Sequence, residues 1–189
     1  MRARLVLLVI GVAACAPGVP LMAQQPASDV ISHPPDVREF TSASGGFVFR
    51  VGTNDKWKSG VAVAELLVPA KAGAMISRWR KPLPHFEGPR RVLVSDNGYV
   101  ALFDDWINSP SPRSIMVLDS RGNTVAIYTF EALVQALGVT PRIVADSAHL
   151  GIWLTTEPQL SPDRTTVILR AGGHTLALSL NTGKLERTR

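Results

Sequence analysis

Between residues 91 and 137 the sequence alternates short apolar runs with residues that favour tight turns. Residues 92–94 are apolar and mostly β-branched, and Ser95-Asp96-Asn97-Gly98 follows at once. Asn-Gly between two apolar runs is a strong hairpin signal, because Asn and Gly both tolerate the positive φ angles that a two-residue turn requires. The pattern therefore predicts a hairpin whose return strand is residues 99–103.

The second half of this stretch predicts another hairpin and then a helix. Residues 115–118 and 124–128 are apolar runs separated by Asp-Ser-Arg-Gly-Asn, which again favours a turn. Thr129 suits a helix N-cap, and the apolar residues after it recur at helical spacing until Gly138. We predict one short helix near residues 130–137, ended by Gly138 with Pro141 beyond it.

The remaining chain predicts further strands and no second helix. Residues 61–68 favour a strand, with a helix as the alternative, and residues 81–91 contain three prolines and are expected to form a loop. The fold class is therefore all-β, mainly antiparallel, in a single globular domain over residues 37–189. The other expected strands are residues 47–51, 75–80, 150–154, 165–170 and 174–180.

The N-terminus predicts export. A basic start, an apolar run over residues 5–14 and Leu-Met-Ala before Gln24 indicate a signal peptide at residues 1–23. Val-Ala-Ala-Cys at residues 12–15 is similar to a bacterial lipobox, so lipidation of Cys15 is the alternative. Residues 24–36 are polar and Pro-rich and are expected to form a flexible linker. The protein is thus expected to be periplasmic or secreted, or else lipid-anchored to the envelope.

Composition excludes several classes of function. The formal charge is +5, and two of these positive charges belong to the predicted signal peptide, so the surplus is too small to indicate nucleic-acid binding. The only cysteine is Cys15, which leaves the globular part without a disulfide or a thiolate metal site. The four histidines have no zinc-ligand spacing, and no phosphate-binding loop or nucleophile elbow is present. We therefore expect no cofactor and no metal.

A Ser-led turn feeding an apolar strand occurs three times, beginning at Ser42, Ser95 and Ser161. Residues 160–184, which run from Ser-Pro-Asp to Asn-Thr-Gly-Lys, resemble one blade of a bacterial β-propeller. The central unit is similar to a group of uncharacterised exported bacterial proteins, through Val-Ser-Asp-Asn-Gly at 94–98 and Phe-Asp-Asp-Trp at 103–106. The resemblance implies blade-like hairpins more than an activity. Arg164 stands where such a turn usually has Gly, and about three units are fewer than closed propellers contain.

Two groups of residues are candidates for function. Asp104 and Asp105 are adjacent carboxylates that an envelope glycan hydrolase would use as acid and base. Basic residues surround Trp79, which suits a glycan- or polyanion-binding surface. The candidate ligand-binding residues are Arg78, Trp79, Arg80, His85, Asp104, Asp105 and Trp106.

The absence of a recognisable nucleophile–base pair or metal pattern favours a protein that is not an enzyme. The leading hypothesis is an exported, non-catalytic β-rich module of the cell envelope that binds or scaffolds an envelope protein or glycan. The hydrolase and the glycan- or polyanion-binding module are the alternatives. Membrane association is expected only through lipidation of Cys15, and the sequence leaves the oligomeric state open.

Overall fold

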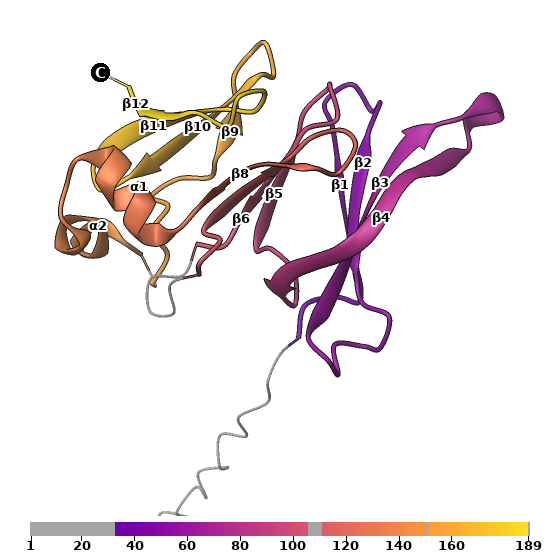
Figure 1. Ribbon diagram of the computed structural model, residues 1–189, viewed down its shortest axis with the longest axis horizontal. Coiled ribbons are helices and arrows are strands. Elements are labelled where there is room, and N and C mark those ends of the chain that lie inside the picture. Colours follow the sequence, from indigo (N-terminus) through magenta and orange to yellow (C-terminus); the bar gives the residue numbers. More distant parts are fainter. Residues whose placement is uncertain (1–32, 106–110, 150, 189) are drawn as a thin grey trace, which may run out of the picture. The chain divides into compact units, whose positions relative to one another are not determined.

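A computed structural model of the chain describes residues 33–105, 111–149 and 151–188 (Figure 1). These residues belong to one compact unit, His33–Arg189. The predicted signal peptide with Cys15, most of the predicted linker, and Trp106 lie outside the described residues. Among the residues that are described, no helix has the length and apolar character needed to span a membrane.

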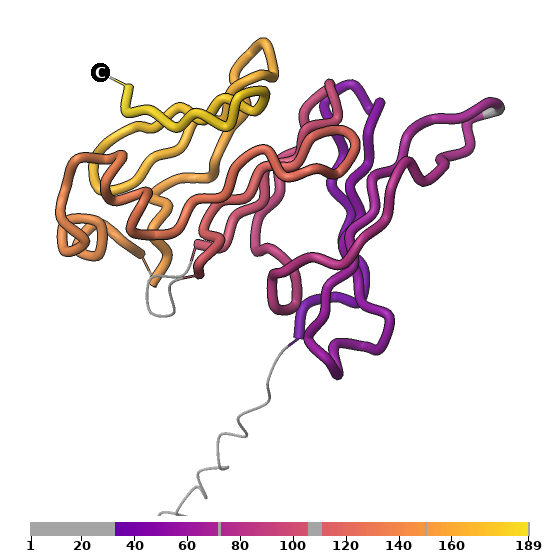
Figure 2. Tube along the Cα trace, in the orientation of Figure 1, coloured from indigo at the N-terminus to yellow at the C-terminus, as the bar shows by residue number. Residues whose placement is uncertain are grey.

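The described residues form three four-stranded antiparallel sheets, each built from four consecutive strands of the chain. Figure 2 follows the chain from the first sheet, which begins in indigo, to the last sheet, which ends in yellow. The predicted all-β, mainly antiparallel class is therefore confirmed. The first sheet contains β1 (Val37–Thr41), β2 (Val48–Gly52), β3 (Val61–Pro69) and β4 (Met75–Phe86). The central sheet contains β5 (Arg91–Val94), β6 (Val100–Phe103), β7 (Ile115–Leu118) and β8 (Thr124–Tyr128). The third sheet contains β9 (Gln159–Leu160), β10 (Thr166–Ala171), β11 (His174–Ser179) and β12 (Leu185–Arg187).

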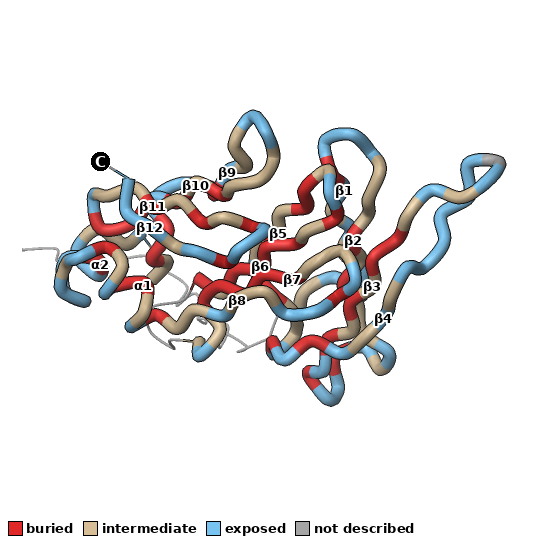
Figure 3. The backbone as a smooth tube through the Cα atoms, turned by 45° about the horizontal axis from the view of Figure 1, so that its top comes forward, coloured by how far each residue is buried: buried red, intermediate tan, exposed pale blue. Residues whose placement is uncertain are grey.

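The central sheet is buried on both faces, which explains why β6 and β7 are apolar at every position (Figure 3). Successive side chains of a strand point to opposite faces. Leu102 accordingly joins the core shared with the first sheet, whereas Phe103 joins the core shared with the third. The first core also contains Phe49, Val51, Ala64, Leu66, Val92, Val94, Val100, Met116 and Leu118, and the second contains Ala101, Ile115, Val117, Val167, Leu169, Leu176 and Leu178.

Helix α1 (Phe130–Leu137) adds its apolar face to the second core and confirms the predicted helix. The Thr129 hydroxyl accepts a hydrogen bond from the Ala132 N–H at 3.2 Å, and Gly138 adopts the left-handed conformation expected of the C-terminal residue. Helix α2 (Pro141–Ser147) was not predicted. Pro141 begins it, because the missing N–H of a proline costs nothing in the first turn of a helix.

The structure decides three further expectations, for residues 61–68, 81–91 and 150–154. Residues 61–68 lie in strand β3, so the helix alternative is wrong. The expected loop at residues 81–91 is mostly strand, since β4 continues through Pro82 and Pro84 to Phe86. Strand β4 lies at the edge of its sheet, where a proline without an N–H can be tolerated. Residue 150 of the expected strand at 150–154 lies outside the described residues, and residues 151–154 contain only a bridge from Ile152 to His149.

Candidate functional site

The three Ser-led turns predicted from the sequence occupy the same place in their sheets, between the first and second strands. In each turn the serine N–H donates to the carbonyl of the residue just before or at the start of the second strand. The serine hydroxyl accepts a hydrogen bond from the N–H of that same residue. The pairs are Ser42–Phe47, Ser95–Tyr99 and Ser161–Thr166, with N–H to O=C distances of 2.9, 2.9 and 2.8 Å.

Each of these turns contains one residue with positive φ. It is Gly45 in the first turn and Gly98 in the second, with φ of 72° and 78°. Asn97 does not share this conformation, so the expectation that both residues of the Asn-Gly turn have positive φ is wrong. In the third turn the position belongs to Arg164, with φ of 60°. A side chain in the left-handed region costs about 1 kcal/mol or more.

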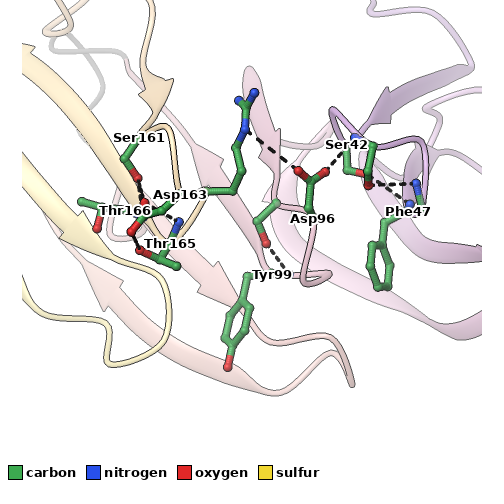
Figure 4. A network of polar contacts seen from close by, with 12 residues as sticks. Ser42, Phe47, Asp96, Tyr99, Ser161, Asp163, Thr165 and Thr166 are labelled. Atoms are coloured by element: carbon green, nitrogen blue, oxygen red, sulfur yellow. Dashed lines mark hydrogen bonds and ion pairs between the residues drawn. The ribbon is translucent and has the colours of Figure 1, made fainter.

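Asp96 links the three turns (Figure 4). Its Oδ1 accepts a hydrogen bond from the Ser44 N–H at 2.8 Å, and its Oδ2 lies 4.0 Å from Arg164 Nε. The main-chain bond from Ser44, followed by the Ser44 side chain and the positive charge of Arg164, holds the pKa of Asp96 below its usual value. We call the turns at residues 42–47, 95–99 and 161–166 the three-turn junction.

An open groove of about 530 Å³ lies beside the three-turn junction. We call it the inner groove, and it is lined by residues 40–41, 43, 92–94, 158–160 and 164. These residues come from β1, β5 and β9 with their flanking turns, so the first strand of every sheet contributes. The groove is mainly apolar, and Arg164 is the charged residue in its lining.

Main-chain groups of the first strands on the side of the inner groove have no hydrogen-bond partner among the described residues. Each first strand is paired on one side only, as the outermost strand of its sheet. Main-chain groups in an antiparallel pair point alternately toward and away from the partner strand. Because Ser95 bonds to Tyr99, the N–H and C=O groups of Val94 and Val92 point away from β6. Ser42 and Ser161 bond to their second strands in the same way. The main-chain N–H and C=O groups of Thr41 and Leu160, one residue earlier, therefore point away from β2 and β10.

Of the two adjacent carboxylates predicted as a site, Asp105 lies in the interior and is held by charged partners. Asp105 is fully buried, and its oxygens lie 2.9 Å from Arg90 Nε and 2.8 Å from Arg91 Nε. The Arg91 guanidinium also reaches Glu157 at 2.8 Å. Asp105 therefore faces two guanidinium groups, and this arrangement suits a structural ion pair.

His85 lies in the interior near Asp104, and the residue is 5% exposed. Neither ring nitrogen makes a hydrogen bond of good geometry among the described residues, although the main chain of Arg113 lies close to the ring. Burial lowers the pKa of His85. The negative charge of Asp104 and the main chain of Arg113 oppose this effect only in part, and the positive charge of Arg113 adds to it. The structure thus brings His85, Asp104 and Asp105 to the end of the central sheet away from the three-turn junction.

Trp79 and Arg80 belong to opposite faces of β4. The Trp79 ring packs edge-on against Phe49 with centroids 5.9 Å apart, and Lys81 Nζ lies 5.5 Å from the Trp79 centroid. Arg80 instead donates a hydrogen bond to Asn54 Oδ1 at 2.9 Å. Arg78 is exposed near the register shift of β3 and β4.

The described residues contain no cluster of three or more His, Cys, Asp or Glu side chains placed to hold a metal ion. No protein-family model matches the chain, and a search of curated proteins found no match. The sequence reasoning did not assign a linking role to Asp96 or a groove-lining role to Arg164. The sequence contains a signal for both residues. The repeated serine turns mark the segments that meet at Asp96, and Arg164 stands where a glycine is expected.

Proposed function

We propose that the protein is a non-catalytic binding module of the cell envelope that holds an extended peptide segment of a partner protein in the inner groove. The observation that carries this proposal is the set of outward-facing main-chain groups on β1, β5 and β9 beside one groove. An extended peptide binds such edges by adding a strand, because its own N–H and C=O groups complete the ladder.

The shape of the three sheets supports the same proposal. Each sheet is a four-stranded meander like a propeller blade, and in that architecture the blades surround a central channel. The inner groove lies next to the first strands, and we propose it as the counterpart of that channel. Apolar side chains such as Leu93 and Leu160 line it and would take alternate side chains of the peptide.

A hydrolase acting through Asp104 and Asp105 gains no support from the geometry, because Asp105 is buried against Arg90 and Arg91. A sugar-stacking role for Trp79 also gains none, since its ring packs on Phe49 and beside Lys81. The assignment to the envelope rests on the predicted signal peptide at residues 1–23.

The test is selection of peptides from a phage-displayed library of random heptapeptides on the purified full chain. Selected peptides are then measured by fluorescence anisotropy against Thr41→Pro, with Thr41→Ala as the matched control. Thr41 is exposed and its N–H points away from β2, so proline removes one outward donor and no ladder bond. Losing one hydrogen bond predicts binding weaker by about 2- to 10-fold for Thr41→Pro alone.

Circular dichroism and a thermal melt confirm that both variants remain folded. Failure to select any peptide, or equal affinity of the two Thr41 variants, would contradict the proposal.

A further inference from the structure

Arg164 is the one place in the three-turn junction where a side chain occupies the left-handed position. The equivalent positions in the other two turns are Gly45 and Gly98, for which this conformation is unstrained. Two further turns of the described chain repeat the preference, with Gly122 and Gly183 at positive φ. Arginine at this position therefore costs stability, and such a residue persists where its side chain has a use.

The Arg164 side chain lies between the three-turn junction and the inner groove. It lines the groove, and 40% of its side-chain surface is exposed. Asp96 is 4.0 Å from its Nε, at the outer limit of an ion pair. A guanidinium carries five N–H donors in a planar fork, which matches the two oxygens of a carboxylate. Contact with Asp96 at that distance leaves donors of Arg164 available to a ligand.

We infer that the inner groove selects peptides that carry a carboxylate, and that Arg164 is the residue that recognises it. This inference rests on the proposed peptide-binding function and adds the chemistry of the partner. The carboxylate belongs either to an Asp or Glu side chain or to the free C-terminus of the peptide. Asp96 acts as a positioning residue, because it is held by Ser44 and lies beside the guanidinium.

The experiment uses synthetic versions of one library-selected peptide. The acidic side chain is changed to its amide in one version, and the C-terminal carboxylate is amidated in another. Anisotropy is measured on the wild-type full chain, Arg164→Gly and Arg164→Lys. Arg164→Gly restores the residue found at the equivalent turn positions, so it is expected to unfold at an equal or higher temperature than the wild type.

We expect Arg164→Gly to weaken binding of the carboxylate peptide by roughly 10- to 100-fold, as for loss of a hydrogen-bonded charge. Arg164→Lys keeps the charge without the planar fork and should fall between the two. On the wild-type chain, one of the two amidated peptides should bind more weakly by the same factor as the unmodified peptide does on Arg164→Gly. That peptide identifies the source of the carboxylate. Neutral versions should be indifferent to the change at Arg164.

Equal binding of acidic and neutral peptides, with Arg164→Gly unchanged, would overturn the inference. The peptide-binding function would then still stand if Thr41→Pro weakened binding. If no peptide is selected from the library, both the function and the inference fall together. If Arg164→Gly loses binding of neutral and acidic peptides equally, the residue shapes the turn, and its recognition role is overturned.

Discussion

The carboxylate of Asp96 accepts a hydrogen bond from the main-chain N–H of Ser44, 52 residues earlier in the chain, at 2.8 Å. The bond joins the first turn of the central sheet to the equivalent turn of the first sheet. The core that these two sheets share is apolar. Asp96 therefore fixes the position of one turn relative to the other at the mouth of the inner groove.

Changing Asp96 to Ala is expected to release the Ser44 amide, because its acceptor is removed. Hydrogen exchange followed by NMR should show faster exchange at Ser44. Asp163→Ala is the matched control, because within the described part of the chain the Asp163 carboxylate bonds to Ser161 and Thr165 of its own turn. Unchanged exchange at Ser44 in Asp96→Ala would contradict the linking role.

The turns and strands of the central sheet could be predicted because their signals are local. Ser95 to Gly98 marks its own hairpin, and Thr129 with Gly138 marks both ends of α1. Strand β4 was predicted to end early, since nothing local shows that Pro82 and Pro84 belong to an edge strand. Pro141 was treated as a residue that follows a helix, although it begins the next one.

The candidate site could be predicted only in part. The repeat located the three turns, but their meeting at Asp96 depends on how the sheets stack. The role of Asp105 was hidden for the same reason, because its partners Arg90 and Arg91 lie 15 and 14 residues earlier and are brought to it by the pairing of β5 with β6. A side chain's partner across a sheet leaves no periodic signal in the sequence.

His85 predicts a pH dependence of stability. Its folded-state pKa is lowered by burial, so the unfolded chain binds more protons below the ordinary histidine pKa of about 6.5. Stability is fully present above that pH and is lost as the pH falls below it, with a slope of at most about 1.4 kcal/mol per pH unit for one proton.

Urea unfolding between pH 7.5 and 5 should show this loss in the wild type. His85→Gln, which cannot titrate, should flatten the dependence in that range, whereas His174→Gln serves as the control because His174 is only half-buried. An equal slope in wild type and His85→Gln would exclude His85 as its source.

Asp105 is expected to contribute stability and no catalysis. Changing it to Ala should lower the free energy of unfolding by about 2 kcal/mol, below the roughly 3–5 kcal/mol for breaking a fully buried pair. The smaller cost follows because the Arg90 and Arg91 side chains are 41% and 28% exposed and can be hydrated when Asp105 is lost. Urea unfolding measures the change, and Asp146→Ala is the control, since its carboxylate pairs with Arg142 on the exposed surface. Equal stability of the two variants would show that the buried pair has no net effect.

The open faces of the first and third sheets are expected to prevent the sheets of another copy from packing against them. Arg50 in β2 is the third residue after Phe47, the partner of Ser42. Leu102 and Leu169 hold the same position in β6 and β10, and both are buried between sheets. Arg50 instead pairs with Glu39 at 2.7 Å and Glu65 at 3.3 Å on the open face of the first sheet. Charge at the ends of a stack of repeats keeps it soluble and stops it growing.

The third sheet ends in the same way. Arg170 in β10 corresponds to Val51 and Phe103, which are buried between sheets, but Arg170 is exposed. We predict that the triple variant Arg50→Leu, Glu65→Leu and Arg170→Val self-associates as its concentration is raised, because it exposes an apolar face at each end of the stack. Sedimentation equilibrium measures the association. Arg142→Leu, which removes an exposed charge from α2, should leave the mass unchanged. A triple variant that keeps the wild-type mass at every concentration would show that these three charged residues do not prevent association.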